Sequence, residues 1–447
     1  MNKRRHVSMI VCCIVPLFAV HALSDADDAL RLEVETALHK AVEYFTTHIA
    51  TNGGYLWWYA SDLSERAGEG KASETQIWVQ PPGTPAVGTA YLHAYERTGD
   101  TTYFDAAKAT ADALVWGQLE CGGWDYSIDF DAERSKRWYY RRDAENGVDG
   151  KGRRNRAVFD DNTTQSALRF IMAVDKATGF EAKYHEAAMY GLALMLKSQF
   201  ENGAWPQSYP LADKGYSRWY TFNDNAMNDC IQVMLDAYEI YGDAKYLDSA
   251  KRAGDFIVAS QLPAPQAGWA QQYDHEMQPA WARKFEPASV CSAVTARNIR
   301  TLMELHEVTD DKKYLAPIPA AIEWLKQSQI SEGRWARFYE LETNRPLYFT
   351  KKYELVYTDD DLPTHYSFQG GYGNGPISDY ERFLAGEPRP TPAEADRRAH
   401  LANLATKVKA IISEQDEHGR WLTDGRIQTR TFSNNIRVLS DYIALAR

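Results

Sequence analysis

The sequence predicts an all-α fold, an α/α toroid (barrel) of up to six helical hairpins, with long loops forming a cleft at one end. Helix-like segments repeatedly end in a Gln that is followed a few residues later by a Gly and an aromatic residue. Between these turns, Gly or Asp repeatedly precedes a Tyr, as a short helix–helix connection requires. No run alternates apolar and polar residues over the length that a large sheet needs. Such a repeat is typical of stacked αα-hairpins.

The Gln–Gly–aromatic turn occurs five times, and a weaker sixth copy spans residues 52–58. The five copies end at Trp124, Trp205, Trp269, Trp335 and Trp421. Their spacing of roughly 65 to 85 residues indicates one supersecondary unit per repeat. We expect these Trp side chains to pack the hairpin turns rather than to contact a ligand.

Apolar residues at helical spacing locate the helices of each hairpin. Helices leading into the turn are expected near 28–50, 103–118, 181–199, 244–261, 312–329 and 394–415. Return helices are expected near 84–97, 162–177, 223–241, 289–308, 376–386 and 433–446. We expect one toroid domain over residues 23–447.

Three connections are too long and too rich in Trp, Tyr, Arg and Asp to be plain turns. They span residues 125–160, 262–288 and 334–375. Because a toroid gathers its long connections at one end, we expect these loops to build the cleft.

The N-terminus has the features of a signal peptide over residues 1–22. Lys3, Arg4 and Arg5 precede an apolar run over 7–20, which is followed by a small-residue cleavage site at Ala22. We therefore expect a secreted or periplasmic protein with no membrane attachment after cleavage. Three cysteines remain beyond this segment, and an odd number without CxxC spacing predicts neither a disulfide framework nor a zinc site.

The formal net charge of −11 argues against a nucleic-acid partner. The same charge repels an acidic ligand, so such a ligand requires local arginines or a bridging divalent cation. We expect the protein to act as a monomer.

Two polar clusters open neighbouring return helices, FDDNTTQ at 159–165 and TFNDNAM at 221–227. Asp and Asn at these positions suit helix N-caps. Alternatively, Asp161 and Asp224 meet at one end of the toroid and share a hard cation that prefers oxygen ligands. The sequence leaves both interpretations open.

Two further clusters lie in the long loops, PAWARKFE at 279–286 and RFYELETNRP at 337–346. The second carries Arg337 and Arg345, which either form a structural salt-bridge patch or bind the carboxylates of an acidic sugar.

These clusters, taken in order, resemble the family 10 polysaccharide lyases, also called the pectic acid lyase family. The similar stretches are FDDNTTQSALRF, NGAWPQSYP, YSRWYTFNDNAM, AQQYDHEMQPAWARKFEP and ARFYELETNRPLYF, which together cover about residues 158–350. The resemblance implies an α/α toroid and an enzyme, a carbon–oxygen lyase that degrades pectate by β-elimination with Ca²⁺. The implied partner is an acidic polysaccharide substrate.

The resemblance also assigns roles to residues. It implies that Asp161 and Asp224 serve the substrate and the calcium ion and that Arg283 is the catalytic base. It further implies that Arg345 clamps the substrate.

The substrate-binding set that we predict also includes flanking residues: Asn162, Asn225, Arg337 and Tyr220. Elimination requires loss of the C5 proton beside a sugar carboxylate whose growing charge is neutralised by a cation or by arginines. An Arg pKa above about 12 does not by itself suggest a base, so that role comes from the resemblance.

The chain departs from the family pattern at several points. Asp160 replaces the usual aliphatic residue ahead of DN, Tyr220-Thr221-Phe222 replaces IT, and Glu342 replaces a Gly. The segments 77–88 and 122–130 lie beyond the pectate-lyase core. Other uronate polymers, alginate or glucuronan, therefore remain open.

Two other functions remain open on the same fold. One is a toroidal glycoside hydrolase that uses Asp161 or Asp224 as its acid. The other is a glycan-binding protein without catalysis, since 13 Trp and 27 Tyr offer surfaces on which sugar rings stack.

Overall fold

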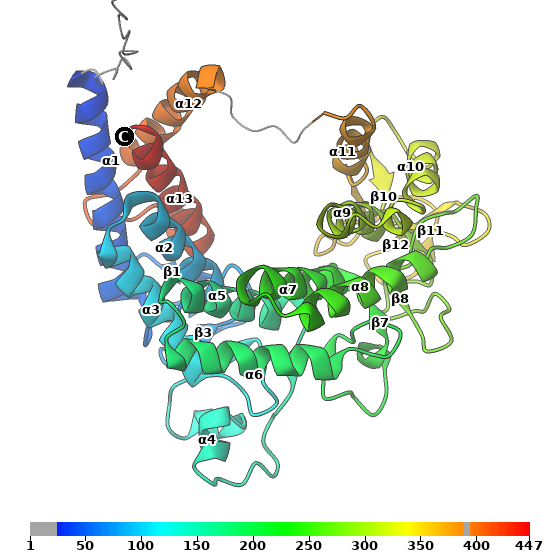
Figure 1. The fold of residues 1–447 in the computed structure, drawn as a ribbon, viewed down its shortest axis with the longest axis horizontal. Helices are drawn as coiled ribbons and strands as arrows, with labels where there is room; N and C mark the ends of the chain where they lie inside the picture. The colour runs from blue at the N-terminus through cyan, green and yellow to red at the C-terminus, as the bar shows by residue number, and fades with distance from the viewer. Residues whose placement is uncertain (1–24, 388–393) are drawn as a thin grey trace, which may run out of the picture.

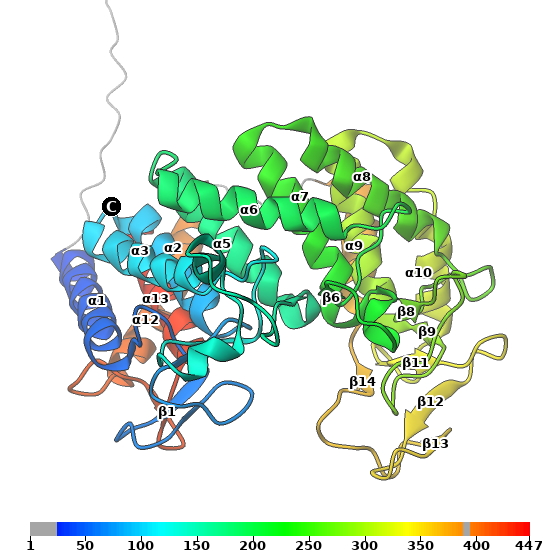
Figure 2. The same ribbon diagram turned by 90° about the horizontal axis from the view of Figure 1, so that it is seen from below.

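The computed structural model describes residues 25–387 and 394–447, and its helices form the predicted hairpins (Figures 1 and 2). The helices leading into each turn are α1 (Asp25–Tyr44, continued by a π-helix, Phe45–Ile49), α3 (Thr101–Trp116), α6 (Ala182–Ser198), α8 (Ala244–Ala259), α10 (Ile318–Gln327) and α12 (Glu394–Ser413). The return helices are α2 (Thr84–Thr98), α5 (Thr163–Ala177), α7 (Ala226–Tyr241), α9 (Ser292–Thr309), α11 (Asn374–Leu384) and α13 (Thr429–Leu445). The predicted all-α toroidal fold is confirmed.

The return helices form the inner layer of the toroid. Helices α2, α5, α7, α9 and α11 pack in chain order, and α13 packs on α2, so that the last hairpin joins the first. Helix α13 also packs on α1 and α12. Figure 1 shows the arc of hairpins open between α11 and α12.

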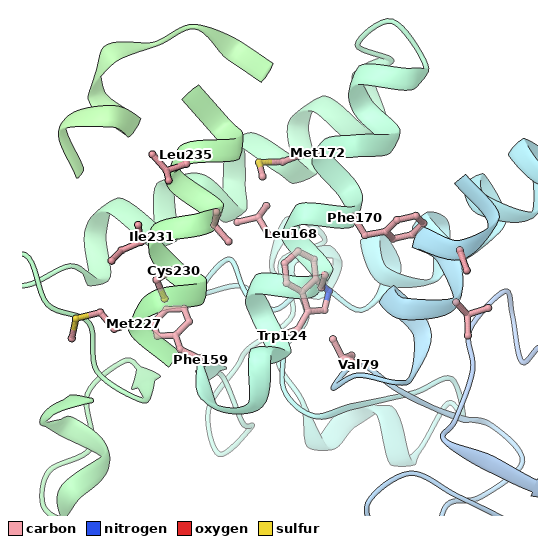
Figure 3. Packing of buried hydrophobic residues seen from close by; sticks show 14 of the residues in the cluster. Val79, Trp124, Phe159, Leu168, Phe170, Met172, Met227, Cys230, Ile231 and Leu235 are labelled. Carbon is pink, nitrogen blue, oxygen red and sulfur yellow. The ribbon is translucent and has the colours of Figure 1, made fainter. Parts of the chain in front are cut away.

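Each Gly–Trp turn is fixed to its own helix by an indole hydrogen bond. Trp205 is fully buried and donates from Nε1 to the carbonyl of Met195, ten residues earlier, at 2.9 Å. The bonds from Trp124, Trp335 and Trp421 also reach back ten residues, and that from Trp269 reaches back twelve. Figure 3 shows Trp124 in the core beside Leu168. These side chains pack the turns, as predicted.

The Gln of the turn connects neighbouring hairpins. Gln199 Nε2 donates to the carbonyl of Gly203 in its own turn and to that of Ser249 on α8, at 2.9 and 3.0 Å. Gln118 and Gln415 each make the same two bonds. One bond goes to a carbonyl in the residue's own turn, and the other goes to a neighbouring helix, α6 for Gln118 and α1 for Gln415. The recurring Gln therefore joins successive hairpins at the loop end.

Short strands follow the Trp turns and pair with strands that lead into inner helices. The pairs are β3 (Gln76–Trp78) with β4 (Ser127–Asp129), β5 (Ala157–Val158) with β6 (Ser208–Tyr209), β7 (Tyr220–Thr221) with β8 (Gln272–Tyr273), and β9 (Val290–Cys291) with β11 (Phe338–Tyr339). The pair of β1 (Trp58–Ala60) with β16 (Arg426–Gln428) connects the first repeat to the last. Each inner helix thus begins from a strand that is held by its neighbour.

The other short elements lie in the long loops or extend these pairs. They are β2 (Arg66–Ala67), α4 (Arg141–Glu145), β10 (Trp335–Ala336), β12 (Pro346–Phe349), β13 (Leu355–Val356), β14 (Gln369–Gly370) and β15 (Leu422–Thr423). The largest sheets in the described ranges have four strands.

The predicted signal segment, residues 1–22, lies outside the described residues. Across 25–387 and 394–447, no helix combines the length and hydropathy that crossing a membrane requires. Cys121, Cys230 and Cys291 are free thiols.

Candidate functional site

Two loops at the same end of the toroid share one backbone design. The first loop comprises residues 159–165 and the second 222–228. Each begins with a buried Phe, and the Phe159 and Phe222 N–H groups donate to the carbonyls of Gln207 and Gln271 at 2.8 and 2.9 Å. A 3-10 turn follows, Asp160–Asn162 or Asn223–Asn225, and then the inner helix α5 or α7 begins. The two loops are therefore held in equivalent places on neighbouring hairpins.

Both loops hold two consecutive residues in the left-handed region. The φ angles are 51° and 57° at Asp161 and Asn162, and 44° and 62° at Asp224 and Asn225. This conformation is unfavourable for residues with a Cβ, and such strain gathers at functional sites. Neither Asn side chain caps the helix that follows it, so the N-cap interpretation does not explain these residues.

The loops bring three carboxylates together. Asp160, Asp161 and Asp224 each present an oxygen, and these atoms all lie within 4.8 Å of one another. Gln165 fixes the distance between the loops, because its buried Nε2 donates to the carbonyls of Phe159 and Ala226 at 2.7 and 3.1 Å. The prediction had paired Asp161 with Asp224, and the structure adds Asp160 to them.

Burial and mutual repulsion raise the pKa of two of these acids. Burial, followed by the charges of Asp161 and Asp224, raises the pKa of Asp160 to about 8, against the opposing effect of Arg283. Burial, with the charges of Asp224 and Glu69, raises the pKa of Asp161 to about 6. Because like charges this close disfavour ionisation, the cluster gains most from a bound cation or proton.

Both loops carry buried oxygen acceptors without a partner among the described residues. Asp160 Oδ1, Asn162 Oδ1 and Asn223 Oδ1 are buried, and no described residue donates a hydrogen bond to them. An unpaired buried acceptor is unfavourable, and a hard cation with oxygen ligands relieves that cost. Among the described residues, the acidic group holds neither Cys nor His, which makes it unsuited to zinc. These oxygens fit calcium.

Arg283 connects the carboxylate cluster to a buried glutamate. Its Nε and Nη2 atoms bind Glu286 at 2.7 and 2.6 Å, and its Nη2 lies 3.6 Å from Asp224 Oδ2. Glu286 is 1% exposed and also accepts from Gln271 and Tyr366. Although burial alone would lower the Arg283 pKa, Glu286 and Asp224 raise it above its ordinary value. Arg283 is therefore both a structural partner of Glu286 and a neighbour of the cluster.

Arg337 lies near the same tyrosine, Tyr366. Its guanidinium is 4.5 Å from the centre of the Tyr366 ring, and that of Arg283 is 5.7 Å from it. Arg337 Nε is buried, and no described residue accepts a hydrogen bond from it. Both arginines thus lie beside one aromatic ring and close enough to Asp224 to feel its charge.

The remaining predicted residues have contacts elsewhere. Arg345 is exposed and stacks on Tyr357 at 3.4 Å, and no described hydrogen bond or ion pair joins it to the carboxylates. Tyr220 packs its ring against Phe200 and Phe256. Asn225 is exposed beside Asp224. Their predicted roles in substrate binding stay predictions.

Sequence reasoning missed two aromatic residues near Arg283. Tyr366 lies in the loop 334–375, where no spacing pattern connects it to Glu286. Trp281 stands two residues before Arg283, is 46% exposed, and donates from its indole to the Arg283 carbonyl at 2.9 Å. Its exposure, the signal of a ligand-stacking surface, is invisible in the sequence.

Comparison with known proteins agrees with this geometry. Residues 129–334, slightly less than half of the chain, match the pectic acid lyase family. No curated protein matches the chain.

Similar solved structures show the fold. A family 10 polysaccharide lyase from Cellvibrio cellulosa, in a mutant form in complex with trigalacturonic acid, is 22% identical with a TM-score of 0.51, covering 67% of this chain and 98% of that one. A second structure described as a family 10 polysaccharide lyase from Cellvibrio cellulosa is also 22% identical with a TM-score of 0.51, covering 66% and 95%. A D-mannose isomerase is 14% identical with a TM-score of 0.50, covering 94% and 99%.

The family match includes both carboxylate loops and Arg283. The resemblance predicted from the sequence is confirmed, and this chain is a polysaccharide lyase built on an α/α toroid.

Proposed function

We propose that this lyase is secreted and cleaves pectate (polygalacturonate) by calcium-assisted β-elimination. The observation that carries the proposal is the meeting of three carboxylates with Arg283 inside the segment that matches the pectic acid lyase family, with Arg337 just beyond the end of that segment. The trigalacturonic acid bound to the similar lyase supports a galacturonate polymer as the substrate.

In this proposal Asp161 and Asp224, joined by Asp160, hold the calcium ion. Bound calcium would neutralise the sugar carboxylate beside the carbon that loses its proton. Arg337 binds a sugar carboxylate, because it is a partly buried cation whose Nε has no partner among the described residues. Arg345, which is exposed and stacks on Tyr357, binds the substrate at a separate point.

Arg283 accepts the C5 proton in this proposal. Glu286 and Asp224 favour its charged form, which works against that role. A cation shared by the carboxylates would take up the charge of Asp224 and remove one of these two effects, whereas the pair with Glu286 would remain. The proposal therefore makes deprotonation of Arg283 easier when the acidic cluster is occupied.

An inverting glycoside hydrolase fits the cluster less well, because its pair of carboxyls stands about 6.5 to 9.5 Å apart to admit a water molecule, whereas these oxygens lie within 4.8 Å of one another. A retaining pair stands about 5 to 5.5 Å apart, so the spacing alone does not separate that mechanism from a lyase. Hydrolysis also assigns no role to the unpaired Nε of Arg337.

The test is product formation on polygalacturonate, alginate and glucuronan, after chelation and again after calcium is restored. We expect ultraviolet absorbance from an unsaturated product on polygalacturonate, its loss in excess EDTA and its recovery with calcium. Full activity in EDTA contradicts the calcium assignment. New reducing ends without the absorbance indicate a hydrolase, and binding without turnover indicates a glycan-binding protein.

Secretion has a separate test, in which the mature N-terminus is sequenced from periplasmic and medium fractions. We expect it near Leu23 to Asp25. An intact Met1 in the producing cells contradicts secretion.

A further inference from the structure

We propose that a cavity between α2, α5, α7 and α13 is an additional subsite for a negatively charged sugar unit, with Arg437 as the residue that binds its carboxylate. This inference rests on the proposed function, in which the substrate is a polyuronate.

The cavity has the size and lining of a ligand site. Its volume is about 380 Å³, within the range of about 300 to 1,000 Å³ usual for small-molecule sites. Pro85, Ala86 and Phe170 supply apolar surface, and Arg437 and Asn162 are among the polar groups that line it. Concave sites of this kind bind sugars through an apolar wall and a few polar groups.

The wall on the α2 side depends on a glycine. A Cβ placed on Gly88 would lie 2.3 Å from Cζ of Phe170, so any larger residue would push α2 away from α5. Figure 3 shows Phe170 reaching from α5 toward the neighbouring helix. The segment 77–88, for which the lyase resemblance offers no role, thus shapes this cavity.

Arg437 is a half-buried cation that makes no ion pair with a described residue, although the charge of Asp441 acts on it. Across the described residues, none forms an ion pair or hydrogen bond with its guanidinium. Asp441, one turn later on α13, is occupied by His93 at 2.9 Å and Arg97 at 3.0 Å. Burial lowers the Arg437 pKa, so the free protein holds this charge at a disadvantage that a ligand carboxylate would remove.

The charges around the cavity leave one positive charge for a ligand. Arg169, also on the lining, binds Asp236 through Nε at 2.6 Å and is neutralised by it. Arg437 therefore supplies the uncompensated charge, which matches one carboxylate.

The cavity borders the first carboxylate loop. Asn162 lines the cavity and follows Asp161 directly in the first loop. A polymer with one sugar at the cluster can therefore extend another into the cavity. Helices α2 and α13 lie outside the matched residues 129–334, so these two hairpins add the subsite to the matched core.

The experiment compares wild type with Arg437→Ala, Arg437→Lys and the control Arg430→Ala, an exposed arginine on the same helix. Calorimetry measures the affinity for galacturonate oligomers of increasing length, and for methyl-esterified, uncharged oligomers, in calcium. Because hydrogen bonds to charged groups contribute about 1.5 to 3 kcal/mol, we expect Arg437→Ala to weaken binding of the longer acidic oligomers by roughly 10- to 100-fold. Arg437→Lys should keep part of the affinity. The shortest oligomer bound, the uncharged oligomers and Arg430→Ala should show no change.

The outcomes separate this inference from the proposed function. Equal affinity of wild type and Arg437→Ala at every length overturns the subsite, as does an equal loss for the uncharged oligomers. Wild type that binds uronates without forming an unsaturated product overturns the proposed function alone. Wild type that binds no uronate overturns both. Melting temperatures show whether each variant is folded, and Arg437→Lys carries the test if the Ala variant unfolds.

Discussion

The first and second carboxylate loops have the same backbone and differ in charge balance. Both run from a strand through a buried Phe and two left-handed residues into an inner helix. In the first loop Asp160 and Asp161 stand together, and the pKa of each is raised. In the second, Asp224 accepts from Asn223 at 2.8 Å and lies 3.6 Å from Arg283.

This difference shows that Arg283 approaches the second loop most closely, and that its charge does not offset the burial and repulsion of the two acids in the first loop. In the proposed calcium site, a metal ion would stabilise the first loop, whereas Asp224 of the second loop already lies near Arg283. Metal binding would therefore change the environment of the arginine through the second loop. The strongest tests therefore alter the contact between Asp224 and Arg283.

The largest effect is expected from Arg283→Lys. Lysine keeps the charge but loses the planar fork that spans Glu286 and Asp224. If Arg283 is the base, turnover should fall by about 10²- to 10⁴-fold, while calcium-dependent substrate binding survives. The measurements are initial rates of unsaturated product formation against pH, substrate affinity and melting temperature.

The matched control is Arg300→Lys, in an arginine–aspartate pair with Asp379 on α9 and α11. It should keep wild-type turnover. A folded Arg283→Lys variant with near-normal turnover would show that Arg283 is only the structural partner of Glu286.

A smaller effect should distinguish Asp161→Asn from Asp224→Asn. Both should weaken calcium binding by at least about 10- to 100-fold, the loss seen even for residues that only support metal ligands. Without metal, Asp161→Asn should raise the melting temperature because it relieves repulsion. Asp224→Asn should not, because it also removes the partner of Arg283 and Asn223.

Calorimetric calcium titration and thermal unfolding in EDTA check this pair. Equal melting temperatures of the two variants would show that the loops do not differ in charge balance. Unchanged calcium affinity in both would remove the cluster as the metal site.

The repeat made the fold predictable from the sequence. The Gln–Gly–aromatic turns are local patterns, and the bonds of Gln199 and Trp205 show why each of their residues recurs. The short strands carried no such signal, because two or three paired residues are too few to set an alternating pattern.

The site was only partly predictable, because its charge balance arises between distant segments. The loop motifs pointed to Asp161 and Asp224, but Asp160 registered as a departure from a family pattern. Its role depends on burial and on the approach of a second loop, which Gln165 fixes through Ala226. Tyr366 and the free charge of Arg437 depend likewise on tertiary contacts.

The smallest effect is a pH dependence that Asp160→Asn should alter. In the folded protein Asp160 and Asp161 keep their protons up to about pH 8 and pH 6, whereas unfolded aspartate releases them near its ordinary 3.8. The folded state therefore binds more protons than the unfolded state within this window, so metal-free stability should fall as pH rises from about 4 to 8. Calcium binds the ionised form, and the stabilisation that it adds should grow over the same range.

Asp160→Asn makes the first loop resemble the second. It should remove the fall in metal-free stability between about pH 6 and 8 and leave the part of the fall that is due to Asp161. Melting temperatures across this range, in EDTA and in calcium, check the prediction, and Asn223→Asp provides the reverse exchange, which should steepen the fall. A wild-type and an Asp160→Asn curve that coincide in EDTA would show that Asp160 is ionised in the free protein and that the first loop is not the unsatisfied one.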